Sequence, residues 1–246
     1  MTDSADCIVL ASFGGGVNST AMLIGMHERG ERVDMILFAD TGGEKPHTYA
    51  HRDEFSDWLV AHGMPPIITV RMEVETLESD CLKRKALPGV AYGFKSCSDH
   101  FKMRPQRNYM KANGIIAATT MIGFDAGETH RAKEIEGNRY PLIEWDWGRE
   151  ECIEAITRAG VSQPGKSSCF FCPNMKKPEI FQLRRQYPAL AERAVAMERN
   201  AELTAVKGLG RSFAWGDLYA ADDGQAKLFP DSSVSQCDIC YDGESV

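Results

Sequence analysis

Three consecutive glycines, Gly14 to Gly16, follow an apolar run and precede Asn18, Ser19 and Thr20. An apolar run that enters a glycine-rich turn and continues into a helical pattern predicts a strand, a tight turn and a helix start. Main-chain N–H groups then face outward, and the helix N-terminus adds positive potential, so the turn attracts an anion. The residues of this predicted phosphate site are Ser12, Gly14, Gly15, Gly16, Asn18, Ser19 and Thr20.

The glycine turn departs from two common phosphate-binding patterns. It is not G-x-x-x-x-G-K-[ST], because no lysine follows the glycines, and it is not G-x-G-x-x-G. The alternative is a tight turn that binds nothing. Glycine loses more conformational freedom on folding than other residues, so three in a row favour a turn that a ligand approaches closely.

Charged residues follow two other apolar runs. Asp40 ends the run 33–40. We expect its carboxylate to reach a ribose or a metal-bound phosphate, and the alternative is that it caps a turn. Arg131 and Lys133 follow the run 115–124. Such cations neutralise charge that develops on a reacting phosphate group, although they also suit surface ion pairs with neighbouring glutamates. We predict Arg131 and Lys133, with Ser19, as catalytic residues.

Two further cations lie close to Cys97 in the sequence. Lys102 and Arg104 are candidates to hold an anionic substrate, and a solvated helix face is the alternative. We include both residues in the predicted nucleotide site.

Eight cysteines are present, and two pairs have C-x-x-C spacing: Cys169 with Cys172, and Cys237 with Cys240. Disulfides are rare in reducing compartments, so this spacing favours metal binding. The two pairs together would form a tetrahedral zinc site, although the gap between them exceeds that of a compact zinc ribbon. A redox dithiol or unrelated buried thiols are the alternatives.

The 246-residue chain carries a net charge of −7, and 43% of its residues are hydrophobic. It lacks the strong basic excess typical of nucleic-acid-binding proteins, although local basic clusters leave such a partner open. The first residues are acidic, and the apolar runs are shorter than a membrane span. We therefore expect a cytoplasmic protein without a signal peptide or a membrane partner.

Strand-like and helix-like segments alternate over residues 1–160, which predicts a parallel α/β sheet with helices on both faces. Ligands of such sheets bind beyond the carboxyl ends of the strands. The expected strands lie within 6–12, 33–40, 65–72 and 115–124, and the expected helices within 19–30, 46–62 and 99–113.

The regular alternation of strand-like and helix-like segments ends after residue 160. A loop-like segment contains Cys169 and Cys172, a helix over 179–203 is interrupted at Pro188, and the last 40 residues show weak periodicity. We predict a nucleotide-binding α/β domain over residues 1–160 and a helical to irregular, metal-binding subdomain over 161–246.

Five segments, in order, resemble motifs of the adenine-nucleotide alpha-hydrolase (PP-loop ATP pyrophosphatase) superfamily. GGGVNST resembles its pyrophosphate loop, SGGxDS. This group includes the phosphoadenosine-phosphosulfate-reductase-like sulfonucleotide reductases, tRNA sulfurtransferases and DNA phosphorothioation sulfurtransferases. The resemblance covers roughly residues 6–180 and implies a doubly wound HUP/Rossmann-like sheet. The other matching segments are 38–51, 96–105, 123–133 and 140–156.

Two loop positions depart from the family pattern. Gly14 replaces a serine, and Asn18 replaces an acidic residue. Loss of that carboxylate weakens the expected handling of Mg²⁺. Backbone N–H groups, Ser19 and Thr20 still suit a phosphate.

The resemblance also implies a cluster site. In several relatives, cysteines of the segment around Cys97 and of a C-x-x-C pair hold an iron–sulfur cluster, and four thiolates suit a [4Fe–4S] cluster. We favour Cys240 over Cys237 as the fourth ligand because CYDG indicates a tight turn. Zinc is the alternative metal. The predicted ligands are Cys97, Cys169, Cys172 and Cys240.

The resemblance implies an enzyme that cleaves ATP, with Mg²⁺, between the α and β phosphates. It would adenylate an oxygen that a sulfur or nitrogen nucleophile then displaces, with a nucleic acid or base precursor as acceptor and a possible sulfur donor. A sulfonucleotide reductase is one alternative, but the E-C-G-[IL]-H segment and the C-C pair of those enzymes are absent. A non-catalytic nucleotide-binding module with structural zinc is the other.

Overall fold

A five-stranded, all-parallel sheet organises the molecule, in the strand order β3-β2-β1-β6-β7. The computed structural model describes residues 7–91, 94–115 and 118–228. A short antiparallel pair, β4 with β5, lies outside the sheet. The strands are β1 (Ile8–Phe13), β2 (Met35–Ala39), β3 (Ile67–Val70), β4 (Val90–Ala91), β5 (Phe94–Lys95), β6 (Ala118–Ile122) and β7 (Asn138–Arg139).

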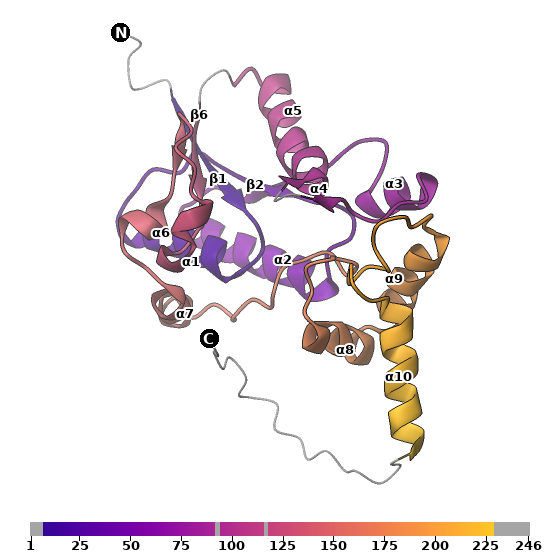
Figure 1. Cartoon of the computed structure of the whole chain (residues 1–246). Coiled ribbons are helices and arrows are strands. Elements are labelled where there is room, and N and C mark those ends of the chain that lie inside the picture. The colour runs from indigo at the N-terminus through magenta and orange to yellow at the C-terminus, as the bar shows by residue number, and fades with distance from the viewer. Residues whose placement is uncertain (1–6, 92–93, 116–117, 229–246) are drawn as a thin grey trace.

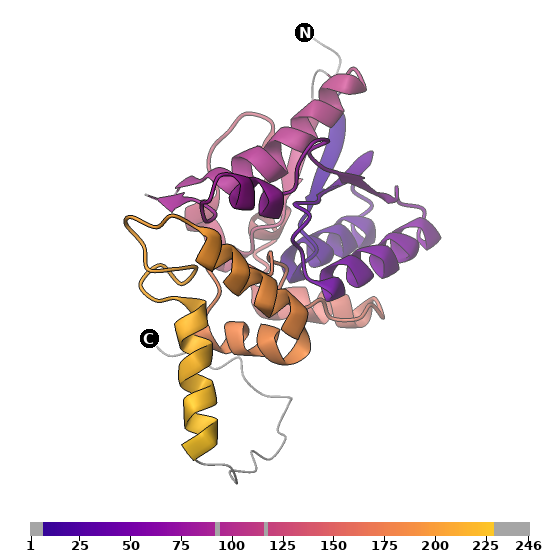
Figure 2. The same ribbon diagram turned by 90° about the vertical axis from the view of Figure 1, so that its right-hand side faces the viewer.

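Helices cover both faces of the sheet, as Figures 1 and 2 show. Four of them, α1, α2, α6 and α7, pack on one face, and α5 packs on the other. The helices are α1 (Val17–Glu28), α2 (Pro46–Ala61), α3 (Leu77–Lys83), α4 (Ser96–Ser98), the π-helix η1 (Asp99–Met103), α5 (Arg104–Ala112), the 3₁₀-helix η2 (Ala126–Arg131), α6 (Pro141–Glu144), α7 (Arg149–Arg158), α8 (Lys177–Gln186), α9 (Pro188–Asn200) and α10 (Trp215–Leu228).

Successive side chains of the central strands enter opposite cores. Leu10 of β1 and Leu37 of β2 belong to the core under α5. Ala11 of β1 and Ile36 of β2 belong to the larger core under α1, α2 and α7. Both faces of these strands are apolar because both are covered, which is the pattern expected of a parallel sheet. The predicted α/β fold class is therefore confirmed.

A third apolar core lies beside the sheet and joins the C-terminal helices to earlier segments. It contains Leu77 of α3, Phe101 of η1, Phe171 of the C-x-x-C loop and Trp215 of α10. Trp215 is fully buried, so α10 is anchored by its first residue. This core therefore crosses the expected boundary at residue 160, and the division into two domains stays a prediction.

Residues 215–228 form the helix α10, although the sequence shows weak periodicity there. The carboxylate of Glu198 in α9 explains how this helix starts, since it accepts hydrogen bonds from the N–H groups of Leu209, Trp215 and Gly216. A cap supplied by a distant helix leaves no signal in the local sequence.

Among the described residues, no helix has both the length and the apolar character needed to cross a membrane.

Candidate functional site

The connections of the sheet diverge at its centre. Ser12 in β1 pairs with Leu37 of β2 on one side and with Ile122 of β6 on the other. After β1, the chain forms β2 and β3 on one side of it. The chain forms β6, on the other side of β1, only after α5. The loops after β1 and β6 therefore separate, and parallel sheets bind ligands at such a switch point.

A cavity of about 780 Å³ opens at this switch point. Its walls come from the glycine turn and α1, the end of β6 with η2, the start of α7, and the segment 165–179. The lining residues are Ser12, Gly14, Gly16, Val17, Asn18, Ser19, Ile122, Gly123, Phe124, Glu128, Arg131, Arg149, Gly165, Lys166, Ser167, Lys176 and Glu179.

The glycine turn is shaped partly by its own packing. Gly15 has a φ of +73°, and a Cβ there would lie 2.8 Å from Cγ2 of Thr48. A Cβ on Gly16 would lie 2.9 Å from Oγ of Ser167. Gly15 is thus required by the fold itself, and Gly16 leaves room for the Ser167 side chain. Gly14 is exposed and lines the cavity, where a ligand can approach its backbone.

The start of α1 leaves main-chain donors for a ligand. No described side chain caps this helix at Gly16, and its first helical hydrogen bond runs from the N–H of Thr20 to the carbonyl of Gly16. The N–H groups of the preceding turn are those that an α-helix leaves unpaired. They lie beside the cavity, so an anion bound there would meet both these donors and the positive end of the helix dipole.

The hydroxyl groups of Ser19 and Thr20 point to different places. Ser19 lines the cavity, and its Oγ accepts from the N–H of Gly14 at 3.2 Å and donates to the carbonyl of Gly16 at 3.1 Å. Thr20 is fully buried, and its Oγ1 lies 3.0 Å from Nε2 of His51. The structure thus places Ser19 at the cavity, whereas Thr20 packs beneath the turn.

Asn18 links the turn to two carboxylates. Its Nδ2 donates to Oδ2 of Asp125 at 2.9 Å and to Oε2 of Glu128 at 3.0 Å. Glu128 also pairs with Arg131, whose guanidinium lies 4.2 Å from the ring centroid of Phe124. The acidic group that the turn lacks is therefore supplied nearby by the segment after β6.

Asp40, Lys133 and Arg104 do not line this cavity. The Asp40 carboxylate accepts from the N–H of Gly42 at 2.8 Å and from the hydroxyl of Tyr49 at 2.7 Å, so it stabilises the loop between β2 and α2. Burial and this hydrogen bond raise the pKa of Tyr49 above its usual value. Lys133 and Arg104 are exposed side chains beyond η2 and at the start of α5.

Lys102 lies at a buried polar cluster instead. Its Nζ is 3.3 Å from Oε1 of Glu44, a carboxylate with 1% exposure whose Oε2 has no partner among the described residues. Burial is the largest single effect and lowers the pKa of Lys102, but the charge and hydrogen bond of Glu44 together with the charges of Cys169 and Cys97 outweigh it, so the pKa is raised overall. Sγ of Cys169 completes the cluster, 3.8 Å from the same oxygen and 3.1 Å from Oγ1 of Thr41.

Three of the four predicted cluster ligands lie at one core. Cys97, Cys169 and Cys172 all contribute to the apolar core beside the sheet. Among the described residues, no three Cys, His, Asp or Glu side chains are grouped for metal binding, and Cys240 lies outside the described residues. Burial and then the neighbouring Glu44 raise the pKa of the Cys169 thiol. A metal there would have to displace its proton.

Several cavity residues were missed from the sequence. Arg149, Lys166, Lys176 and Ser167 line the cavity from α7 and from the segment before α8. The run GKSS at 165–168, with a basic residue between small ones, was the available signal. It gave no indication that it would fold back against the glycine turn.

Comparisons with known proteins found similarity without a family assignment. No protein-family model matches the chain. It is 26% identical over 205 residues to the uncharacterized protein MJ0066 of Methanocaldococcus jannaschii, a match that covers 75% of this chain and 40% of the relative. The U34-tRNA thiolase NcsA from Methanococcus maripaludis, solved with its [4Fe-4S] cluster, aligns with a TM-score of 0.45 and 13% identity. That alignment covers 79% of this chain and 72% of the thiolase.

Proposed function

We propose that this chain is a PP-loop-type enzyme that binds ATP at the glycine turn and cleaves it between the α and β phosphates. The observation that carries the proposal is the position of this turn. It precedes the uncapped N-terminus of α1, at the switch point of a parallel sheet, beside a cavity of about 780 Å³. That volume suits a nucleotide-sized ligand.

The lining residues supply the charge that such a ligand needs. Main-chain N–H groups of the turn and the hydroxyl of Ser19 would hold the β and γ phosphates. Arg131, Arg149, Lys166 and Lys176 would neutralise the charge that develops on the departing pyrophosphate. Arg131 thereby keeps its predicted catalytic role, and Lys133 contributes no cavity contact.

Mg²⁺ fits the residues next to the turn. Asp125 and Glu128 present carboxylate oxygens to the amide of Asn18, and Mg²⁺ in nucleotide sites is commonly held by one or two carboxylates together with phosphates. When bound, the ion would neutralise phosphate oxygens. These two side chains would therefore replace the acidic residue that the turn lacks at position 18.

A [4Fe–4S] cluster, with zinc as the alternative, stays our proposal for Cys97, Cys169, Cys172 and Cys240. The donor set supports it, since three of these cysteines contribute to one core. Lys102 also lies close enough to Cys97 and Cys169 for its positive charge to interact with their thiolates. A nearby cation favours thiolates. When bound, such a cluster would carry or activate sulfur for transfer.

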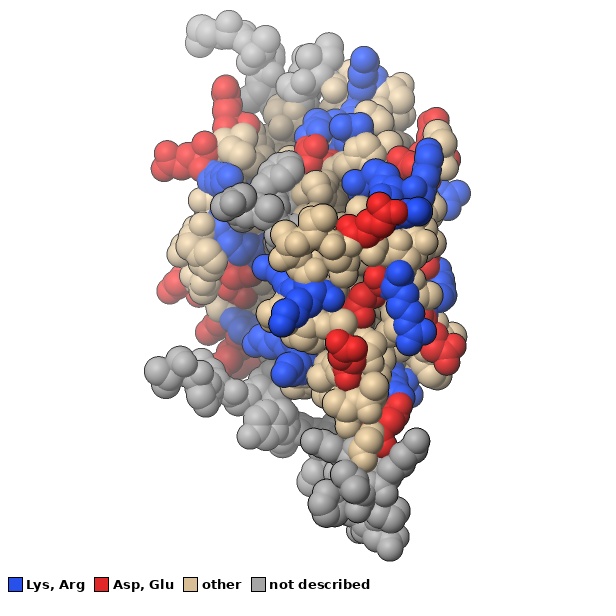
Figure 3. All heavy atoms as spheres, turned by 45° about the vertical axis from the view of Figure 1, so that its right-hand side comes forward, with Lys and Arg blue, Asp and Glu red and all other residues tan. Residues whose placement is uncertain are grey.

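The acceptor that we propose is a nucleic acid or base precursor, with sulfur transfer as the overall reaction. This part rests on the motif resemblance. Figure 3 shows basic and acidic side chains interspersed over one face of the molecule. That distribution favours a limited contact with an acceptor over a long phosphate-binding track.

The test is the product of ATP turnover. The anaerobically purified chain, with ATP and Mg²⁺, should release AMP and pyrophosphate, measured by ³¹P NMR and chromatography. Ser19→Ala should lower the rate about 10- to 100-fold, because a phosphate donor is lost. Ser162→Ala, at an exposed hydroxyl that donates to Glu54 and does not line the cavity, is the matched control and should leave the rate unchanged.

Release of ADP and inorganic phosphate would contradict α–β cleavage. ATP binding without any AMP, with and without candidate acceptors, would favour the non-catalytic nucleotide-binding module instead.

A further inference from the structure

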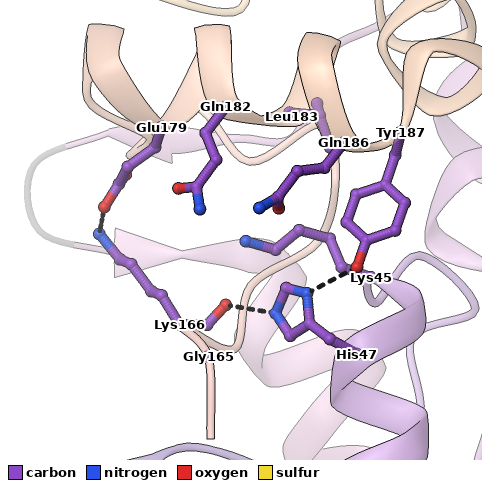
Figure 4. Close-up of a pocket in the computed structure, with 9 residues that line it drawn as sticks. All are labelled: Lys45, His47, Gly165, Lys166, Glu179, Gln182, Leu183, Gln186 and Tyr187. Atoms are coloured by element: carbon purple, nitrogen blue, oxygen red, sulfur yellow. Dashed lines mark hydrogen bonds and ion pairs between the residues drawn. The ribbon is translucent and has the colours of Figure 1, made fainter. Parts of the chain in front are cut away.

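A second cavity, of about 480 Å³, lies next to the first. It is formed by the start of α2, the segment 165–166 and one side of α8, as Figure 4 shows. Gly165, Lys166 and Glu179 line both cavities. Lys166 and Glu179 form an ion pair at 2.5 Å, so this pair separates the two spaces.

Lys45 is the unusual residue of the second cavity. It is only 8% exposed, and no hydrogen bond or ion pair of its amine is found in the described part of the chain. Figure 4 shows this amine extending into the cavity, toward the amides of Gln182 and Gln186. An ammonium group that reaches a cavity from a largely buried side chain, with no ion-pair partner among the described residues, is available to a ligand that supplies the opposite charge.

The surroundings leave Lys45 as the excess positive charge. Glu179 and Glu44 both attract Lys45, but Glu179 is paired with Lys166 and Glu44 with Lys102, so three lysines share two carboxylates and one positive charge is in excess. Burial, and then the charge of Lys45, lowers the pKa of His47, so its imidazole is neutral at pH 7. The His47 ring is held at both nitrogens, with Nδ1 3.2 Å from the Tyr187 hydroxyl and Nε2 3.4 Å from the carbonyl of Lys166.

We propose that this second cavity binds a phosphate group of the acceptor substrate, with Lys45 as its counter-ion and the amides of Gln182 and Gln186 as donors. Its volume suits a phosphorylated sugar-sized fragment. The assignment to the acceptor rests on the proposed function. The binding of a phosphate group at Lys45 does not.

The position of the cavity supports this assignment. A reaction that joins an acceptor to the adenylyl group of ATP needs two adjacent sites, and the two cavities share the Lys166–Glu179 wall. Because the charge of Lys45 is unmatched while that of Lys166 is paired, the second cavity would favour an anionic group over a neutral one. The burial of Lys45 also lowers its pKa, and a bound phosphate would oppose that shift.

The test is a binding titration with the full chain. The first cavity is filled with non-hydrolysable α,β-methylene-ATP, and calorimetry then measures binding of inorganic phosphate, a pyrimidine 5′-monophosphate and a short oligonucleotide without terminal phosphates. Lys45→Met should weaken binding of the phosphate-bearing ligand about 10- to 100-fold, because a charge-assisted contact is lost. Lys83→Met, at an exposed lysine at the end of α3, is the matched control and should bind as the wild type does.

Stability gives a second readout. Lys45→Met should raise the melting temperature without ligand, since an unmatched buried charge is removed, so weaker binding cannot be blamed on unfolding. The gain should shrink as the pH rises toward 10.5, because the folded lysine loses its proton at a lower pH than the unfolded one. Gln182→Leu is a second variant that should weaken phosphate binding.

The outcomes separate the two proposals. Loss of mononucleotide binding in Lys45→Met would identify a small phosphomonoester as the ligand, and loss of oligonucleotide binding would identify a phosphodiester backbone. If the wild type, Lys45→Met and Gln182→Leu bind all three ligands with equal affinity, the second site is overturned. Failure of the ATP analogue to bind would overturn the proposed function, but a Lys45-dependent phosphate affinity would still support the second site.

Discussion

At the scale of single residues, polar side chains at the carboxyl edge of the sheet are arranged around missing partners. Lys45 is buried with no partner among the described residues, and Oε2 of Glu44 is likewise unpaired there. The amide of Asn18 instead occupies the space between two carboxylates. Unpaired buried groups lower stability, and they concentrate where a ligand or a metal completes them.

Asn18→Asp tests the proposed Mg²⁺ ligands. Without Mg²⁺, the variant should melt at a lower temperature than the wild type, because a third carboxylate would face Asp125 and Glu128 where an amide now donates to both. Added Mg²⁺ should raise its melting temperature more than that of the wild type. Differential scanning fluorimetry with EDTA or Mg²⁺ measures both effects.

Asn18→Ala is the matched control for this prediction. It loses the same hydrogen bonds but adds no charge, so its response to Mg²⁺ should not exceed that of the wild type. An equal Mg²⁺ response in Asn18→Asp and Asn18→Ala would rule out Asp125 and Glu128 as ligands.

At the scale of elements, close approach between segments decides where small residues are needed. α1 packs against α7 and against the loop after α6, where Gly25 faces Trp145 and Trp147. A Cβ on Gly25 would lie 2.5 Å from Cζ3 of Trp145. The same reasoning applies to Gly15 and Gly16, so the glycine turn is held in place by the elements around it as well as being open to a ligand.

Gly25→Ala should destabilise the protein by roughly 1–3 kcal/mol, although alanine favours helices, because the indole rings must move in a close-packed core. Gly224→Ala in α10 is the matched control. No atom of the described residues lies within 4 Å of its added Cβ. This variant should be more stable by up to about 1 kcal/mol, from helix propensity alone.

Urea unfolding monitored by circular dichroism measures both glycine variants. Equal effects of the two substitutions would show that the tryptophans do not restrict position 25.

At the scale of the whole molecule, the apolar core beside the sheet brings together segments that are far apart in the chain. α3, η1 and the loop that carries Cys169 and Cys172 meet α8, α9 and α10 there. Its assembly brings Cys97 to the same core as the C-x-x-C pair. A metal bound by these cysteines would connect both halves of the chain, so metal loss should lower the stability of the whole molecule.

Anaerobic purification should yield a chain with about four irons and four sulfides and a broad absorption band near 400 nm, the composition of a [4Fe–4S] cluster. Cys97→Ser should lose most of this iron. Cys7→Ser should retain it, because Cys7 lies in the sheet region and pairs with Thr119 at 3.5 Å. A content of one zinc per chain and no iron would contradict the cluster and support the zinc site instead.

Local pattern was sufficient for much of the fold. The predicted runs 6–12, 33–40, 65–72 and 115–124 overlap the parallel strands β1, β2, β3 and β6. Of these, β1 and β2 are largely apolar because both of their faces are covered. The Pro188 break was also readable, since proline ends one helix and starts another. The glycine turn was placed correctly because strand, turn and helix are adjacent in the chain.

The sequence by itself therefore predicted four of the five parallel strands and their order along the chain, whereas the short strand β7 was not among the expected strands. Only the tertiary structure decided which side chains share the carboxyl edge of the sheet. It buried Thr20, engaged Asp40 in a turn, brought Lys166 and Lys176 to the glycine turn, and left Lys45 with no partner in the described part of the chain. The physical reason is that periodicity reports the burial of one face of an element, whereas a partner's identity depends on contacts between residues distant in sequence.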